Sequence, residues 1–158
     1  MSKRGPGWIL AAALVLFAAL GTVPVAAQEF RAGNVLVADP WMRATARANF
    51  AAPVYFDLTL AGEADDVFLG ATSPIAGEVE IRELRELEGV IRNFRLEQVP
   101  IAPGGYRLAP SGIHLAILRA PVIAEGSTVT VILNFQNAGA LEIQVPVLGL
   151  RAADPRAP

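Results

Sequence analysis

The sequence contains no cysteine, one histidine and two methionines, one of which is Met1. The absence of cysteine excludes disulfides, thiolate nucleophiles and thiolate metal sites. His114 and Met42 are the only other soft-metal donors, and two side chains cannot complete a chelating site for a soft metal ion. We therefore expect no complete soft-metal site within this chain.

Lysine is absent after Lys3, and the arginines are scattered among glutamates. Without Lys3 and Arg4, 11 basic residues stand against 15 acidic residues, a net charge of about −4. A nucleic-acid-binding protein gathers basic side chains on one face to neutralise phosphates. The composition therefore predicts that nucleic acid is not a partner.

Residues 1–27 have the pattern of a secretory signal peptide. Lys3 and Arg4 precede an uncharged run that starts at Trp8, and Val25-Ala26-Ala27 offers small residues for cleavage. The uncharged stretch is also about the 20 residues that a membrane span requires, so an uncleaved anchor is the alternative. We favour cleavage because Gly21 to Pro24 dilute the apolar run, which predicts a periplasmic protein without a membrane segment.

The remaining roughly 130 residues are enough for one domain with a real hydrophobic core. We expect a lead at residues 28–34, a β domain at 35–148 and a flexible tail at 149–158. Short apolar runs separated by Gly, Pro, Asn and Asp indicate strands. The clearest are residues 53–60, 67–71, 78–84, 89–95, 113–119, 128–135 and 141–147.

This spacing predicts a single all-β domain, and it fits an immunoglobulin- or cupredoxin-like Greek-key sandwich or barrel. Along 129–135 and again along 141–147 every second residue is apolar, and Thr130, Asn134, Glu142 and Gln144 lie opposite, so each strand has one buried face. We expect these two strands to form a hairpin across Asn137-Ala138-Gly139.

Most enzymatic chemistry has little support in the sequence. A hydrolase would have to use His114 with Ser111, and neither a nucleophile-elbow pattern nor a partner carboxylate accompanies them. Gly104-Gly105 precedes no helix or lysine, which argues against a phosphate cradle. We therefore predict that the protein is not an enzyme.

Two carboxylate pairs are candidates for acid–base or calcium sites. Asp65-Asp66 follows a turn, and Glu78 and Glu80 share a strand face with Arg82. The preferred interpretation of both is a solvated surface, with cross-strand ion pairs around the second pair.

Several segments, taken in order, resemble one bacterial family. These segments are Asp39-Pro40-Trp41-Met42-Arg43-Ala44-Thr45, Ala71-Thr72-Ser73-Pro74, Val79-Glu80-Ile81, Gly89-Val90-Ile91-Arg92, Ile101-Ala102-Pro103-Gly104 and Leu108-Ala109-Pro110-Ser111-Gly112-Ile113-His114. They resemble the periplasmic copper chaperones called PCuAC, over about residues 35–147. The resemblance implies a cupredoxin-like Greek-key fold and an exposed copper(I) site of two histidines and two methionines that delivers copper for cytochrome oxidase assembly.

Only one of these four ligands is carried over. The family's first histidine corresponds to Arg82, its first methionine falls near Asn93, its second histidine corresponds to His114 and its last methionine to Ala116. Arg82 is a permanent cation, Asn93 offers a hard amide oxygen and Ala116 has no donor atom. The resemblance thus implies a degenerate metal site with His114 as the remaining ligand and copper(I) bound weakly or shared with a partner.

Three residues have a structural and a functional interpretation. His114 is either an inherited ligand or a plain strand residue, and we favour the plain residue. Met42 is assigned to packing rather than to a displaced ligand. Trp41 is assigned to a core plug at one end of the barrel rather than to an exposed anchor for a partner.

Two functions follow. The first is a copper-chaperone-like carrier or accessory protein with a degenerate metal site, whose expected partners are copper-handling or oxidase-assembly proteins. The alternative is a metal-free envelope β-sandwich that serves as a structural or protein-interaction module.

Overall fold

The computed structural model describes residues 28–157, so the predicted signal peptide lies outside the described residues. Strands and loops make up this part of the chain, without a helix. The strands are β1 (Glu29–Ala32), β2 (Val35–Arg43), β3 (Phe50–Leu60), β4 (Asp66–Thr72), β5 (Glu78–Leu87), β6 (Val90–Leu96), β7 (Val99–Ile101), β8 (Tyr106–Leu108), β9 (Ile113–Ala120), β10 (Thr128–Phe135) and β11 (Gly139–Leu148). The prediction of an all-β fold is confirmed.

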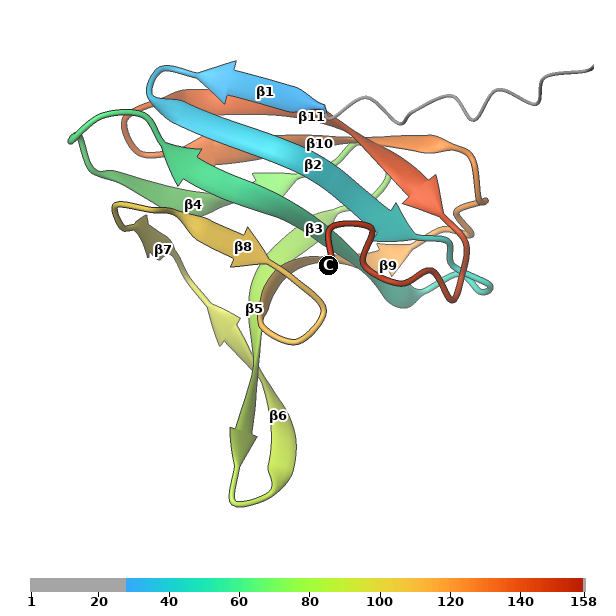
Figure 1. Cartoon of the computed structure of the whole chain (residues 1–158). Helices are drawn as coiled ribbons and strands as arrows, with labels where there is room; N and C mark the ends of the chain where they lie inside the picture. The colour runs from blue at the N-terminus through green and yellow to red at the C-terminus, as the bar shows by residue number, and fades with distance from the viewer. Residues whose placement is uncertain (1–27, 158) are drawn as a thin grey trace, which may run out of the picture.

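The strands are hydrogen-bonded in the order β6-β5-β9-β3-β2-β11-β10-β4-β7, with β1 beside β2 and β8 beside β3. All pairs are antiparallel except β2 with β11, which are parallel. The β5–β6 hairpin projects from the rest of the molecule (Figure 1). The strand β6 therefore forms one edge of the sheet and β7 the other.

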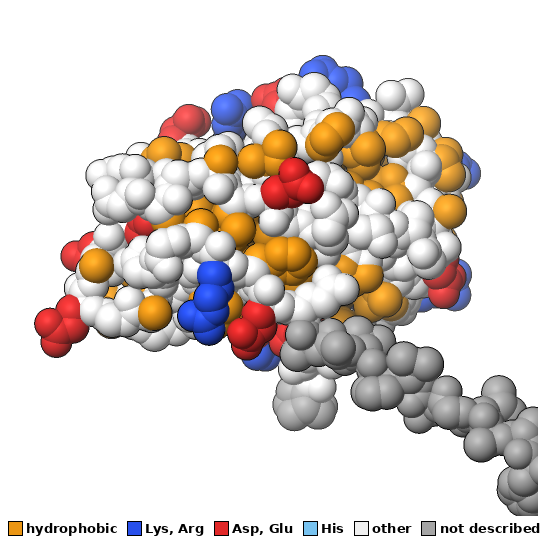
Figure 2. Space-filling model, turned by 90° about the horizontal axis from the view of Figure 1, so that it is seen from above, with side chains coloured by type: hydrophobic (Ala, Val, Ile, Leu, Met, Phe, Trp, Pro, Cys, Tyr) orange, Lys and Arg blue, Asp and Glu red, His pale blue; other side chains and the backbone are white. Residues whose placement is uncertain are grey.

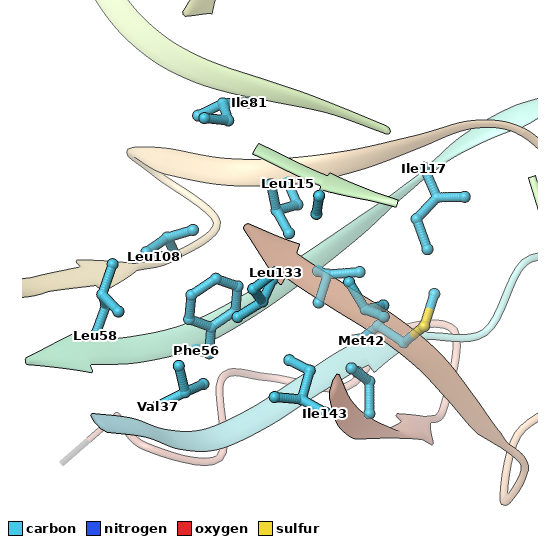
Figure 3. Close-up of a cluster of buried hydrophobic side chains, with 14 of the residues drawn as sticks. Val37, Met42, Phe56, Leu58, Ile81, Leu108, Leu115, Ile117, Leu133 and Ile143 are labelled. Atoms are coloured by element: carbon cyan, nitrogen blue, oxygen red, sulfur yellow. The ribbon is translucent and has the colours of Figure 1, made fainter. Parts of the chain in front are cut away.

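The core lies on one face of the curled sheet, where β2, β3, β9, β10 and β11 direct every second side chain. The predicted β10–β11 hairpin is confirmed, with Phe135 paired to Gly139 across its turn. Val131, Leu133 and Ile143 are fully buried, as the alternation predicts. Figure 3 shows Leu133 and Ile143 in the core. Apolar burial of this kind supplies the main stabilisation of a fold without disulfides.

An irregularity in β2 decides which face its last residues occupy. Val35 and Val37 point into the core, but the register with β3 shifts between Ala38 and Trp41, and Asp39 has a positive φ of 48°. An extra residue in a strand reverses the alternation beyond it. As a result Met42 enters the core, where Figure 3 shows it, and Trp41 turns to the opposite face.

The Gly104-Gly105 turn has a packing role. Gly105 has a φ of 73°, and a Cβ atom at this position would overlap the carbonyl oxygen of Leu58. Glycine is therefore required for the turn before β8 to approach β3.

Figure 2 shows the face of the molecule seen from above in Figure 1. Hydrophobic side chains are dispersed over this face, and its basic side chains stand apart from one another. This face therefore presents no continuous basic strip.

Candidate functional site

The four positions of the implied metal site lie on one face of the sheet. His114 on β9 is the direct cross-strand partner of Arg82 on β5, and Ala116 is the partner of Glu80. Asn93 on β6 is the cross-strand partner of Leu84, two residues beyond Arg82 on β5, and therefore lies on the same face as Arg82. We call this side of β5, β9, β3 and β2, which is opposite to the core, the outer face.

The cation at position 82 is held by acidic neighbours. Nη2 of Arg82 lies 2.8 Å from Oε2 of Glu80, and Nη1 of Arg95 lies 3.3 Å from Oε1 of Glu80. Arg95 and Arg119 also approach Glu78, at 4.0 and 3.6 Å. The predicted cross-strand ion pairs on this strand face are therefore confirmed.

These contacts decide whether a metal ion fits. Within residues 28–157, no three His, Cys, Asp or Glu side chains are grouped so that they could hold a metal ion. Arg82, a permanent cation, is the cross-strand partner of His114, and the Ala116 side chain is buried and has no donor atom. Because copper(I) prefers thioether, thiolate and imidazole ligands, these residues do not fit a four-ligand copper site.

His114 is 7% exposed, and its Nδ1 lies 3.0 Å from the carbonyl oxygen of Gly112. An Nδ1–H that donates to this carbonyl leaves the lone pair on Nε2, the arrangement that orients metal-binding histidines. No hydrogen bond reaches Nε2 from another group in the described part of the chain. Ser111 is exposed, and its hydroxyl is not hydrogen-bonded to His114 among these residues, so the two side chains do not form a hydrolase pair in this structure.

Aromatic rings continue the row beyond His114. The ring centroids of His114 and Tyr55 are 6.2 Å apart, and those of Tyr55 and Trp41 are 4.7 Å apart. Trp41 is 1% exposed but lies outside the main core cluster. The prediction that Trp41 is buried is confirmed, although it packs on the outer face because of the irregularity in β2 and not as a plug of the main core.

The C-terminal segment covers this aromatic row. The guanidinium of Arg156 lies 6.0 Å from the Trp41 ring, donates to Leu108 O at 2.9 Å and pairs with Asp57 and Asp154 at 2.9 Å each. The Arg156 side chain is 5% exposed. The composition predicts a flexible tail, whereas in the structure these contacts hold it against β3 and β8.

Two pKa values reflect this packing. Burial raises the pKa of Tyr55, an effect that nearby Arg43 opposes and nearby Asp154 reinforces. The hydrogen bond from Arg156 lowers the pKa of Asp154, against the opposing effect of burial. The outer-face row therefore stays uncharged at Tyr55 and is bordered by an ionised carboxylate at Asp154.

Two other candidate residues have structural roles. Met42 is fully buried in the core, which confirms its assignment to packing. The interpretation of Asp65-Asp66 as a solvated surface pair is wrong for Asp66, which is 1% exposed. Its carboxylate accepts hydrogen bonds from the backbone N–H groups of Val67, Asn137 and Ala138 at 2.7 to 2.9 Å. The sequence carries no local signal for the long-range contacts with Asn137 and Ala138.

Comparison with solved structures shows which fold the chain has. The apo PCuAC domain of PmoF2 superimposes with a TM-score of 0.66 at 22% identity, covering 79% of this chain and 98% of that domain. The copper-bound PmoF2 domain gives 0.62 at 20% identity, with coverages of 77% and 98%. Apo-DR1885 from Deinococcus radiodurans gives 0.56 at 19% identity, with coverages of 94% and 97%. The chain thus has the cupredoxin-like fold of PCuAC domains.

A match of the sequence to a family model identifies the family of this chain. Residues 35–147 match the family model described as "Putative lipoprotein LpqE-like". The chain belongs to this LpqE-like family, and the resemblance to PCuAC domains is confirmed at the level of the fold. None of the curated proteins compared with this chain matches it.

Proposed function

We propose that this protein is an exported, non-enzymatic copper-handling module of the PCuAC type, whose own metal position retains one imidazole. The observation that carries this proposal is the cross-strand position of His114, which stands where the PCuAC resemblance expects a ligand. The fold of copper-bound PCuAC domains and the orientation of Nε2 support it. In this account copper is cargo, bound weakly or held jointly with a partner.

The ligand set on the outer face argues for a shared site. A single imidazole cannot hold copper(I) tightly, and Arg82 opposes the approach of a second cation. A partner could supply thioether or thiolate ligands to Nε2 of His114. Copper-handling or oxidase-assembly proteins of the same compartment are the expected partners.

A second candidate function is a metal-free interaction module of the cell envelope. The observation that favours it is the ion-pair network of Arg82, Glu80 and Arg95, which stabilises the strand face without a metal ion. In this case His114 is a strand residue that packs against Tyr55.

The location of the protein is part of the proposal. A signal peptide at residues 1–27 would export the chain to the periplasm, and the lipoprotein description of the family supports export. Among the described residues, no helix has the length and apolar character to cross a membrane.

Competition for copper(I) separates the two functions. The purified protein, His114→Ala and the neighbouring control Ser111→Ala are titrated against a copper(I) chelator of known affinity, alone and with candidate assembly proteins. We expect binding to the wild type and to Ser111→Ala that His114→Ala abolishes. If no copper(I) is taken up, either by the protein alone or with the assembly proteins, the result contradicts the copper-handling function and supports the metal-free module. Equal uptake by all three chains would disprove the assignment of His114 as a ligand.

A further inference from the structure

A groove of about 410 Å³ lies at the end of the β2–β3 pair, and none of the four ligand positions lines it. Its walls come from the loop after β2, the first residues of β3 and Leu150, which follows β11. The register places Pro53, one of the lining residues, beside Ala116 of β9. The groove therefore opens on the outer face, one strand away from the implied metal position. Its volume lies in the range of pockets that bind small molecules, about 300–1,000 Å³.

The lining of the groove is largely apolar, and part of it is exposed to solvent. Apart from Thr45 and two arginines, all its residues are alanine, proline, phenylalanine or leucine. Phe50 is 58% exposed and Leu150 is 54% exposed. Large apolar side chains that gather at an exposed concave surface are typical of a site that another molecule covers.

Two arginines give the groove a positive charge. Arg43 and Arg47 both line it, no acidic residue does, and neither arginine forms an ion pair within residues 28–157. Arg43 is fixed through Nε, which donates to Ala152 O at 2.8 Å, and its guanidinium lies 5.5 Å from the Trp41 ring. In a chain with an acidic balance, these two cations favour an anionic ligand.

The rim of the groove is held in place by the body of the protein. Thr45 Oγ1 donates to Pro121 O at 3.0 Å and accepts from the N–H of Ile123 at 2.8 Å. The N–H of Asn49 donates to Ala120 O at 2.8 Å. These bonds fix the loop that carries Arg47, so ordering of this loop costs little on binding.

We propose that this groove binds a single-chain anionic amphiphile, such as a fatty acid or an alkyl phosphate. The head group lies against Arg47 and Arg43, which donate charge-assisted hydrogen bonds to its oxygens. The alkyl chain lies along Phe50, Pro53 and Leu150 and covers their exposed surface. This site is independent of copper, because none of the ligand positions on the outer face lines it.

Calorimetric titration of the full chain tests the proposal with defined probes below their micellar concentrations. The probes are dodecanoate and dodecyl phosphate, the neutral dodecyl maltoside, and the head groups acetate and inorganic phosphate alone. We expect the two anionic amphiphiles to bind with 1:1 stoichiometry and the neutral amphiphile and free head groups to bind at least about tenfold more weakly. Comparison of the carboxylate and phosphate probes identifies the preferred head group.

Matched variants locate the site. Arg47→Gln should weaken dodecanoate binding about tenfold, and Phe50→Ser should weaken it through loss of apolar contact. Arg92→Gln removes an exposed arginine on β6 and should leave binding unchanged. Equal binding of dodecyl maltoside, an unchanged affinity of Arg47→Gln for dodecanoate, or no binding of either anionic amphiphile would overturn the proposal.

Discussion

Asp66 illustrates how one side chain joins distant parts of the chain. Its buried carboxylate lies at the start of β4 and accepts backbone N–H groups of Asn137 and Ala138 in the β10–β11 turn. Burial alone would raise its pKa, but hydrogen bonds from the backbone of Asn137, Val67, Ala138 and Gln136 hold the pKa of Asp66 below its ordinary value. Its charged form is therefore part of the folded structure.

Replacement of this carboxylate should destabilise the fold. We expect Asp66→Asn to lower the free energy of unfolding by about 2 kcal/mol, because the neutral amide accepts fewer and weaker hydrogen bonds. Its exposed neighbour provides a control, since Asp65→Asn should stay within about 0.5 kcal/mol of the wild type. Urea denaturation at neutral pH measures both effects, and equal stabilities of the two variants would contradict this role.

The lowered pKa of Asp66 also predicts a pH dependence. Below the pKa of the unfolded state, the unfolded chain binds a proton that the folded chain does not, so acid favours unfolding. The stabilisation is complete above the unfolded pKa and is lost as the pH falls through the lower folded-state pKa. Stability of Asp66→Asn should therefore decline less steeply than that of the wild type between about pH 5 and pH 3.

At the scale of elements, β2 and the C-terminal segment build the outer-face row together. The shifted register of β2 turns Trp41 outward, and Arg156 then covers its ring. Neither contact follows from the sequence, because a strand irregularity at Asp39-Pro40 reverses a face that alternation alone would assign to the core. The pairing of Arg156 with Asp57 spans 99 residues and has no local signal.

The ordered tail leads to a prediction of its own. Arg156→Gln removes ion pairs to Asp57 and Asp154, and it should lower the free energy of unfolding by about 2 kcal/mol. It should also shift the emission of Trp41 to the red, which can be measured in a chain that begins at Gln28, where Trp41 is the sole tryptophan.

The matched control for the tail is Arg151→Gln. Arg151 is exposed and forms no ion pair in the described part of the chain, so its replacement should change stability by less than about 0.5 kcal/mol. If Arg156→Gln behaves in the same way, the tail is flexible, as its composition predicts, and the contacts over Trp41 do not stabilise the fold.

For the whole molecule, the sequence predicts the larger part of the architecture. The seven strands expected from alternation and turn residues correspond to β3, β4, β5, β6, β9, β10 and β11. The strands that were not predicted are β1, β7 and β8, which span only three or four residues, and β2, whose pattern is interrupted by Pro40. Short or interrupted runs do not contain enough residues to show a period of two.

The candidate site was predictable in its positions but not in its contacts. Motifs of the PCuAC type located Arg82, Asn93, His114 and Ala116, and the register brings them to one face. The ion pair of Arg82 with Glu80 and the hydrogen bond from His114 to Gly112 depend on side-chain conformations that the sequence does not show. The groove beside Arg47 also escaped prediction, because residues of three separate segments form it.

The central claim of the proposed function is that the chain has the fold of a copper-binding PCuAC domain but carries a ligand, His114, at only one of the four metal-ligand positions. The direct test measures copper(I) affinity by chelator competition in the wild type, in Arg82→His and in the triple variant Arg82→His/Asn93→Met/Ala116→Met. Because imidazole and thioether donors would then share one face, the account predicts a gain of roughly a hundredfold or more in the triple variant. Thermal denaturation verifies that the variants fold. Arg82→His places two imidazoles opposite each other on β5 and β9, so this variant should gain copper(I) affinity even if the buried Ala116 position does not accept methionine. A wild type that binds as tightly as these folded variants, or the absence of any gain in them, would contradict the claim.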